Sequence, residues 1–536
     1  MRYGLLPLLI YFIFFCFFTW PWISNFNHYF FTDSGDGLQN VWNIWWVNKS
    51  VAELHQLPWH TQFLHYPFGV TLVGQTLNPF NGFVAIGLLQ IFSLTQTFNF
   101  LVIFSFLFGG LTAFWLCYYL TKSYWSSVIG GAVFTFSSYH FAHAIGHMQL
   151  VSLEFVPLFI LLWWKLIKRP SYKLAIGTSF TLLLVLFCDY YYFLYSLMLA
   201  SFIFGYLLWR KEIPSLKLRS NWLPMLVFVI VTLIIVMPLP IALLLQNNRD
   251  MLTGSHPARV FSTDIATPVI TGGFWYFHSL TDGYWRHVKG YISETTIYLG
   301  ISVISVLAIA VWKRTKIHRD VVFWLATGVF FGVMSFGPRL MVAGRSLEKV
   351  PMPYVIMERI VPGMKLSGMP VRMMFVVTLA SAIIVAMVLS KVNLNKRSGQ
   401  LLIVAFCTLF ILEMWPTKLP LTPNTQPRYV SVLAGLPSTG GVLDNAATSE
   451  PLQLYHQTGF EKPMVFGYVS RTPKSLEKKE FPLFAYTVQN KYELMCHEFK
   501  LRYITTPKYR PLKTTFPIVY KDDEAIVYDL KNSPNC

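Results

Sequence analysis

The sequence predicts an α-helical polytopic membrane protein of about eleven transmembrane helices, followed by a small C-terminal α/β domain. Three observations carry this prediction. Among the 536 residues, 54% are hydrophobic and only 13% are charged, a balance that soluble proteins of this length do not need. The apolar residues form runs of the length that crosses a bilayer, about 20 residues. Residues 417–536 are instead polar and rich in proline and turn residues.

Eleven apolar segments have the composition of membrane-spanning helices. They cover residues 3–22, 98–120, 127–143, 148–167, 174–189, 190–210, 222–244, 293–312, 319–336, 372–391 and 400–416. The apolar stretch 82–94 is too short to span, so we expect an interfacial or re-entrant helix there. No small-residue cleavage site follows the first apolar run, and we expect that run to be retained as the first helix.

Basic residues gather in the short loops on one side of these helices. They are Arg2, Lys122 and the basic residues within 165–173, 210–219, 313–319 and 391–397. The positive-inside rule makes that side cytoplasmic, which accounts for the net charge of +18 without nucleic acid as a partner. We therefore expect a multi-pass protein of the cell membrane with a cytoplasmic N-terminus. Three long segments, 23–97, 245–292 and 337–371, then lie outside together with the C-terminus.

Composition divides the chain into a membrane domain, 1–416, and an extracytoplasmic α/β domain, 417–536. The first outer loop, 23–97, is counted with the membrane domain. Near the end of the chain, residues 517–528 have the pattern of two short strands around an acidic turn. Cys496 and Cys536 lie in the second domain and can pair if it faces an oxidising compartment.

The acidic residues are distributed unevenly over this topology. Only Glu212 and Asp320 fall in the cytoplasmic loops, while the others fall in outer segments, in the C-terminal domain or near the outer ends of helices. The positive-inside rule concerns Lys and Arg and barely constrains acids. Ionisable groups beside the hydrocarbon layer are costly and often mark functional sites. The distribution therefore favours a site on the outer face.

The leading candidate for that site is the motif Asp-Ser-Gly-Asp just after the first helix. Asp33 and Asp36 stand in a turn with Gly35 and Gly37, and an amphipathic aromatic helix begins near Leu38. One carboxylate has the chemistry of a general base toward an acceptor hydroxyl. The other can orient that hydroxyl or hold a divalent cation, Mg or Mn. The alternative is that an aspartate only caps the helix that follows.

This acidic motif in the first outer loop, with juxtamembrane helices and a late soluble outer domain, resembles the GT-C superfamily of membrane glycosyltransferases. Segments 65–69, 143–147, 262–265, 294–300, 335–338 and 368–372 resemble an uncharacterised bacterial and archaeal branch of such proteins. The resemblance implies a polyprenyl-phosphate sugar as donor and Asp33 or Asp36 as catalytic base. The motif differs from the adjacent acidic pair or DxD of the best-known members.

Five further residues lie where outer segments meet helices and are candidates for binding substrate: His147, Asp189, Asp264, Glu294 and Arg372. The spacing of His147 from His140 and His143 suits one helical face that binds a metal or a phosphate. Asp189 is flanked by tyrosines, a combination that suits a sugar. Asp264 and Glu294 bracket the second large loop, where a second acid can complete a metal site. Arg372 can clamp a phosphate bidentately. For each residue an ordinary structural role is the alternative.

These residues predict an inverting glycosyltransferase of GT-C type, a hexosyl- or pentosyltransferase. The lipid-linked sugar enters from the membrane, its phosphate rests near Arg372, and Asp33 or Asp36 deprotonates a glycan, lipid or protein acceptor. Because the leaving group is already a phosphate, the site needs a base and a cation but no obligatory general acid. Two alternatives stay open: a non-enzymatic envelope assembly protein, transporter or flippase, and a ligase-type glycopolymer polymerase that uses outer Arg and His.

Overall fold

The structure is a computed structural model of the chain. It describes residues 3–215, 218–254, 257–273, 275–288, 294, 297–313, 318–361, 363–532 and 536. Several sequence predictions lie outside the described residues. They concern Arg2, Lys217, Arg314, Lys316, residue 293 at the start of a predicted span, and residues 295–296 within the segment 294–300.

The chain folds as two compact units. The first, here called the helical unit, comprises Met1–Asn25, Phe100–Pro238 and His256–Pro420. The second, here called the mixed unit, comprises Phe26–Asn99, Leu239–Ser255 and Leu421–Cys536. The first outer loop and the C-terminal segment, which composition assigns to different domains, therefore belong to one compact unit.

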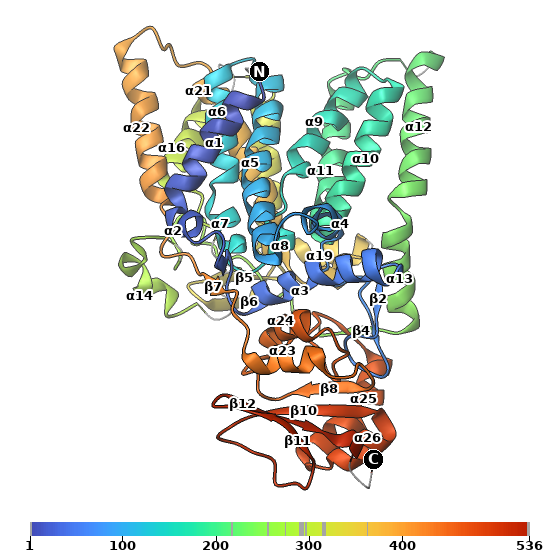
Figure 1. The fold of residues 1–536 in the computed structure, drawn as a ribbon. Helices are drawn as coiled ribbons and strands as arrows, with labels where there is room; N and C mark the ends of the chain where they lie inside the picture. The colour runs from blue at the N-terminus through green and yellow to red at the C-terminus, as the bar shows by residue number, and fades with distance from the viewer. Residues whose placement is uncertain are drawn as a thin grey trace. The chain divides into compact units, whose positions relative to one another are not determined.

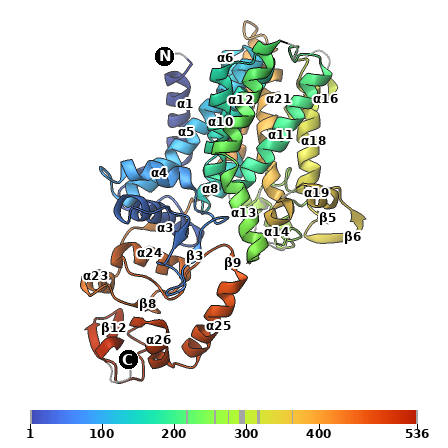
Figure 2. The ribbon, with the colours of Figure 1, turned by 90° about the vertical axis from the view of Figure 1, so that its right-hand side faces the viewer.

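The helical unit has α21 (Met374–Leu389) near its centre, and every residue of this helix is buried. It packs against α6 (Tyr124–Thr135), α16 (Ile301–Trp312) and α18 (Val321–Ser335), as Figure 2 allows the reader to follow. The residues of α21 are almost all aliphatic or small, so the helix can present an apolar surface to neighbours on all sides.

A second group of helices in the same unit surrounds α10 (Tyr172–Cys188). Its neighbours are α9 (Phe155–Lys168), α11 (Tyr190–Trp209) and α12 (Arg219–Ile235) (Figure 1). The other helices of the unit are α1 (Leu5–Phe18), α2 (Trp20–Ser24), α5 (Leu94–Thr121), α7 (Ser138–Ala144), α8 (Met148–Val151), α14 (Asp282–Trp285), α19 (Tyr354–Ile360), α20 (Met364–Ser367) and α22 (Arg397–Met414). Short 3-10 helices occur at His278–Leu280 and Pro370–Met373, and β5 (Arg339–Val342) pairs with β6 (Arg345–Pro351).

The apolar helices identify a membrane protein. Five helical stretches are long and apolar enough to cross a bilayer, namely Leu94–Thr121, Met148–Lys168, Tyr190–Trp209, Pro370–Leu389 and Arg397–Met414. A bent pair, α12 with α13 (Pro238–Arg249), can form a sixth span, with an angle of 47° at the break. Five shorter apolar helices occur at Leu5–Phe18, Pro79–Leu88, Tyr172–Cys188, Ile301–Trp312 and Val321–Ser335. The number of eleven spans stays a prediction, as do the sides on which the termini lie.

Two predicted spans differ from the observed helices for local reasons. The predicted span 127–143 is divided between α6 and α7, because Ser137 leaves the helical conformation and its hydroxyl accepts the amide of His140. The predicted span 222–244 breaks between α12 and α13 just before Pro238, whose ring cannot continue a regular helix. The short stretch 82–94 contains α4 (Pro79–Leu88), which begins after Asn78.

The mixed unit contains a four-stranded sheet with the order β11-β12-β10-β8. Strand β8 (Gly441–Asp444) runs parallel to β10 (Leu501–Pro507), and the other neighbours are antiparallel. The predicted strands around an acidic turn are confirmed as β11 (Ile518–Lys521) and β12 (Ala525–Asp529). The helices of this C-terminal segment are α23 (Arg428–Gly435), α24 (Glu450–Phe460), α25 (Lys474–Val488) and α26 (Tyr492–Phe499).

The first outer loop completes the mixed unit. It contributes β1 (Tyr29–Phe30), α3 (Asp36–Asn48), a π-helical turn (Lys49–Glu53), β2 (His60–Thr61), β3 (Val70–Thr71) and α4. Three two-stranded pairs join β1 to β7 (Thr422–Pro423), β2 to β3, and β4 (Leu252–Thr253) to β9 (Thr472–Pro473). Both faces of the expected amphipathic helix α3 are covered, because Gly37–Val47 are all buried. Trp42 and Trp46 share one apolar core with Leu433 and Val527 of the C-terminal segment.

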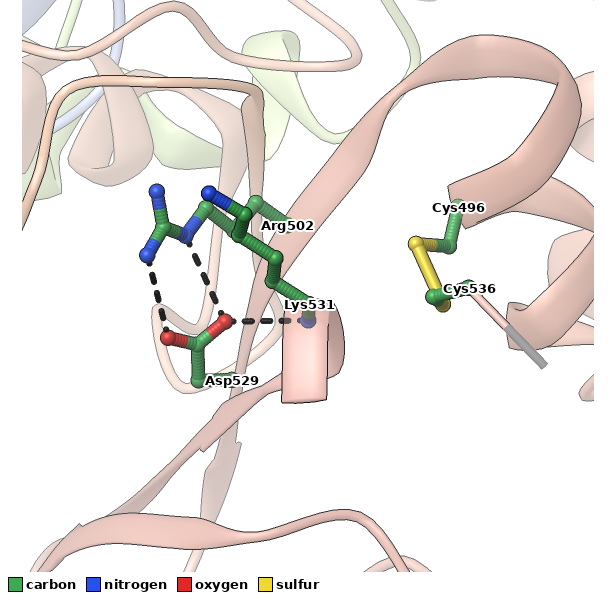
Figure 3. The surroundings of a disulfide bond; sticks show 5 residues. All are labelled: Cys496, Arg502, Asp529, Lys531 and Cys536. Atoms are coloured by element: carbon green, nitrogen blue, oxygen red, sulfur yellow. Dashed lines mark hydrogen bonds and ion pairs between the residues drawn. A yellow bond between two sulfur atoms is a disulfide. The ribbon is translucent and has the colours of Figure 1, made fainter. Parts of the chain in front are cut away.

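Cys496 and Cys536 form a disulfide in the mixed unit (Figure 3). The nearby ion pair between Arg502 and Asp529 ties β10 to the end of β12, with Nε–Oδ1 and NH2–Oδ2 distances of 3.3 Å. Asp529 also accepts the backbone amide of Lys531 at 3.1 Å. These links tie Cys536 to α26 and Asp529 to β10.

Candidate functional site

The turn that carries Asp33 and Asp36 is built by backbone hydrogen bonds to one carboxylate. Oδ1 of Asp33 accepts the amides of Gly35 and Gly37, each at 3.0 Å. The amide of Gly37 belongs to the first turn of α3, where backbone donors have no partner within the helix. Asp33 therefore has the capping role that the sequence offered as an alternative, and its side chain fixes the start of α3.

Asp36 is the first residue of α3 and has a different partner. The hydroxyl of Tyr468, from the segment between α24 and α25, donates to Oδ1 of Asp36 at 2.7 Å. The side-chain amide Nε2 of Gln39, one turn farther along α3, donates to the backbone oxygen of Tyr468 at 3.2 Å. Two contacts thus hold Tyr468 against the beginning of α3. Both aspartates are half-buried.

The segment around Tyr468 is anchored to the first outer loop by a second set of hydrogen bonds. The side chain of Gln75 accepts from the hydroxyl of Ser470 at 2.8 Å and from the amide of Arg471 at 3.0 Å. The guanidinium of Arg471 donates to the backbone oxygen of Gly74 at 2.8 Å. Because these links lie two and three residues after Tyr468, they restrict its position beside Asp36.

The helical unit contains a second polar cluster, formed by a buried ion pair. NH2 of Arg372 lies 2.6 Å from Oε1 of Glu294, and Nε lies 3.4 Å from Oε2. Arg372 is 5% exposed and Glu294 is 3% exposed. The guanidinium also lies over the ring of Tyr191, 4.4 Å from its centroid, which adds a cation–π contact.

Two histidines complete this cluster. Nε2 of His147 lies 3.6 Å from Oε1 of Glu294, and Nε2 of His143 lies 4.0 Å from Oε2. Glu294 precedes α16 and lies outside the apolar helices. Burial alone would raise the pKa of Glu294, but Arg372 and the two imidazoles outweigh burial and hold the pKa below its ordinary value. Glu294 is therefore an ionised carboxylate that Arg372 hydrogen-bonds and two imidazoles flank.

The two histidines and Glu294 also have the spacing of metal ligands. One ligand atom from each of His143, His147 and Glu294 lies within 4.8 Å of the others, a geometry that the described residues show for this group alone. Two imidazole nitrogens and one carboxylate oxygen suit Mn²⁺ or Zn²⁺ better than Mg²⁺, which prefers oxygen ligands. An ion bound there would share Glu294 with Arg372.

His140, Asp189 and Asp264 have contacts that explain them structurally. The ring nitrogens of His140 lie 2.7 and 2.8 Å from the backbone oxygens of Thr135 and Val151. Asp189 caps α11, because its Oδ1 accepts the amides of Tyr191 and Tyr192 at 2.7 and 3.1 Å. Asp264 accepts the hydroxyl of Tyr284 at 2.6 Å and the amide of Gly344 at 2.8 Å, which links its own loop to the turn between β5 and β6.

The structure thus brings together four residues of the helical unit, of which the sequence singled out Glu294, Arg372 and His147. His143 joins them although α7 ends at Ala144, so the three histidines do not share one continuous helix. Sequence reasoning missed Tyr468 as a partner of Asp36. The only sequence feature that pointed to this region was the aromatic and glycine-containing segment 466–471. Its tyrosine, Tyr468, is 432 residues away from Asp36 in the sequence.

Residues 7–414 match the family model described as "Domain of unknown function (DUF6311)". No curated protein matches the chain.

Solved structures of low sequence identity are similar to the chain. The archaeal oligosaccharyltransferase AglB from Archaeoglobus fulgidus, in complex with an inhibitory peptide and a dolichol-phosphate, is 11% identical with a TM-score of 0.45, over 94% of this chain and 69% of that one. The apo form of the Archaeoglobus fulgidus oligosaccharyltransferase is 11% identical with a TM-score of 0.41, over 87% and 65%. ArnT from Cupriavidus metallidurans, bound to undecaprenyl phosphate, is 10% identical with a TM-score of 0.42, over 98% of each chain. Because all three TM-scores lie below 0.5, the function proposed below rests on the chain's own residues.

Proposed function

This chain belongs to the DUF6311 family. We propose that it is a glycosyltransferase that acts on the outer face of the cell membrane and uses a polyprenyl-phosphate sugar as donor. The observation that carries the proposal is the pair formed by Asp36 and Tyr468 at the start of α3. A half-buried carboxylate held by a hydroxyl, in the loop that follows the first apolar helix, has the placement and chemistry of a general base. The resemblance of this loop to GT-C enzymes supplies the donor class.

In this mechanism Asp36 takes the proton of the acceptor hydroxyl. The acceptor oxygen then forms a bond to the anomeric carbon while the bond from that carbon to the donor phosphate breaks, leaving polyprenyl phosphate. One displacement inverts the configuration at the anomeric carbon. Tyr468 orients the carboxylate, whereas Asp33 keeps the turn in shape through the amides of Gly35 and Gly37. We therefore assign the base to Asp36 in preference to Asp33.

Within the helical unit, Arg372 has the chemistry of a phosphate-binding residue. Two of its donor nitrogens bond Glu294, and the planar guanidinium presents further N–H groups that match phosphate oxygens. Glu294 and Tyr191 fix the plane of the guanidinium, so that little conformational entropy is lost when the phosphate binds. His143, His147 and Glu294 would hold Mn²⁺ if the reaction uses a divalent cation. An ion held there would add positive charge for a phosphate bound within the helical unit.

The test uses membranes that contain the full chain and a tritiated undecaprenyl-phosphate hexose. Transfer is measured as tritium that moves from the lipid to acceptors already present in those membranes. Asp36→Asn keeps an oxygen that can accept from Tyr468 but removes the base, and we expect at least a hundredfold loss of transfer. Asp33→Asn keeps an acceptor for the two glycine amides, and we expect less than a tenfold loss. The exposed neighbour Ser34→Ala is the matched control and keeps wild-type transfer.

Full transfer by Asp36→Asn would rule out Asp36 as the base, and full transfer by both asparagine variants would favour a non-enzymatic envelope assembly role. The same assay with EDTA tests the cation. A loss of transfer that Mn²⁺ restores supports the set of His143, His147 and Glu294, whereas transfer that is insensitive to EDTA argues against a required exchangeable ion.

A further inference from the structure

A basic cavity of about 490 Å³ lies within the helical unit, at the ends of α5 and α9 and before α18. It is separate in sequence from every residue assigned to the reaction above. Five cationic side chains line it: Lys122, Lys165, Lys168, Arg169 and Arg319. The positive-inside rule explains why such residues occur in these loops, but it does not require them to converge on one cavity.

Two acids offset part of this charge. Glu212 bonds Lys168 at 2.7 Å and Arg319 at 3.2 Å. Partial burial works to raise the pKa of Glu212, but these ion pairs outweigh it and lower the pKa, so Glu212 stays ionised. Asp320, which lines the cavity, accepts the hydroxyl of Tyr206 at 2.7 Å and lies 3.7 Å from Nε of Arg319. Glu212 therefore offsets the charge of Lys168 and Arg319, and Asp320 offsets that of Arg319.

The other three cations have no carboxylate partner in the described part of the chain. Nζ of Lys122 and of Lys165 lie over the ring of Tyr119, 4.9 and 5.3 Å from its centroid. Arg169, the C-cap residue of α9, also faces the cavity. Lys122 and Lys165, which lie near the same ring, repel each other, and an anion in the cavity would remove that cost.

We propose that this cavity binds a phosphate group, carried by an anionic membrane lipid or free in solution. Guanidinium and ammonium groups together match phosphate oxygens, and basic pockets between membrane helices suit lipid headgroups. The cavity wall also includes Trp164, Leu120 and Leu174, which can contact the apolar part of a lipid. This binding does not depend on the proposed sugar transfer.

The test uses the purified full chain in neutral detergent, with phosphatidylglycerol, phosphatidylcholine or sodium phosphate added. Bound lipid is counted by native mass spectrometry, and thermal unfolding is followed by tryptophan fluorescence. We expect phosphatidylglycerol to bind and to raise Tm. Lys165→Gln with Arg169→Gln should weaken that binding at least tenfold and should raise Tm in the absence of anionic lipid, because repulsion is relieved. Lys396→Gln with Arg397→Gln removes two exposed basic residues outside the cavity and serves as the matched control.

Stabilisation by sodium phosphate alone, lost in the cavity variant, would identify free phosphate as the ligand. Equal binding of phosphatidylglycerol to the cavity variant and the wild type would overturn the proposal, and so would equally tight binding of phosphatidylcholine to the wild type. If the double variant does not fold, Arg319→Gln takes its place, because this side chain is 53% exposed and tolerates replacement. Unchanged binding by that variant would overturn the proposal equally.

Discussion

Arg372 and Glu294 form an ion pair that water scarcely reaches. Burying two charges costs several kcal/mol per ion, and their attraction repays this only when the geometry is good. An apolar pair of similar volume often gives equal or greater stability. A functional role therefore explains the presence of this ion pair, with His143 and His147 beside it, better than a contribution to stability alone.

Single and double substitutions separate these two explanations. Glu294→Gln or Arg372→Met alone leaves a buried charge without its partner, and we expect each to lower the stability by about 3–5 kcal/mol. The double variant removes both charges and should recover most of that stability while sugar transfer stays lost. Tm and tritium transfer measured on the same membrane preparation provide the two readouts. Recovery of transfer in the double variant would reduce the pair to a structural role.

For individual residues, the sequence predicted the chemistry of several side chains but not which residues they contact. Glu294, Arg372 and His147 were recognised because charged and imidazole groups at helix boundaries are costly to place there. The different roles of Asp33 and Asp36 could not be predicted from the sequence, because only the structure shows which carboxylate accepts the glycine amides. The segment 466–471 gave no indication of Asp36 as the partner of Tyr468, since their contact exists only after the C-terminal segment has packed on the first loop.

Among the elements, the start of α3 has little steric freedom. A Cβ added to Gly37 would lie 2.0 Å from Oγ1 of Thr32 and 2.6 Å from its Cγ2, so the turn has no room for a side chain there. A Cβ added to Gly35 would lie 3.5 Å from Oδ1 of Asp33, an ordinary contact distance. The two glycines of the motif are therefore not equivalent.

We expect Gly37→Ala to destabilise the protein by about 1–3 kcal/mol, because Thr32 or the first turn of α3 must shift. Gly35→Ala is the matched control, with an expected loss below about 1 kcal/mol. Thermal unfolding of the purified full chain measures both. Equal Tm values for the two variants would contradict the close packing of Gly37 against Thr32.

Apolar runs predicted where helices occur but not where they break. A helix lies in each of the eleven predicted ranges, yet Ser137 ends one and Pro238 bends another, and hydropathy averaged over a window does not register a single cap or proline. The sequence of α3 predicted an amphipathic aromatic helix. The burial of Trp42 and Trp46 against Leu433 and Val527 depends on a helix and a strand that follow several hundred residues later, so local periodicity could not foresee it.

At the scale of the whole molecule, the mixed unit contains the disulfide between Cys496 and Cys536. Disulfides persist in oxidising compartments, which agrees with the prediction that this unit faces outward. In intact cells, a membrane-impermeant maleimide should label the wild-type chain only after external reduction. Cys496→Ser leaves Cys536 unpaired and should be labelled without reduction, while replacement of both cysteines should abolish labelling. Labelling that requires permeabilised cells would place the unit on the cytoplasmic side.

The division into two units could not be read from composition. Polarity changes near residue 417 and suggests a boundary there, but the first loop has the aromatic content of a membrane-surface segment. Its assignment to the mixed unit follows from the apolar core that Trp42 and Trp46 share with the C-terminal strands and helices. Contacts between segments so far apart in the sequence produce no periodic pattern of apolar residues from which they could be predicted.

The shared core also has a consequence for biosynthesis. The residues from Phe26 to Asn99 are made long before the segment that begins at Leu421, and at about 5–20 residues per second the interval between them is roughly 15–65 s. Until that segment has been translated, Trp42 and Trp46 lack the apolar partners that cover them in the finished unit. The nascent chain thus carries an uncovered aromatic helix throughout the insertion of its membrane helices. In this interval holdase chaperones have the largest exposed apolar surface of this helix to bind.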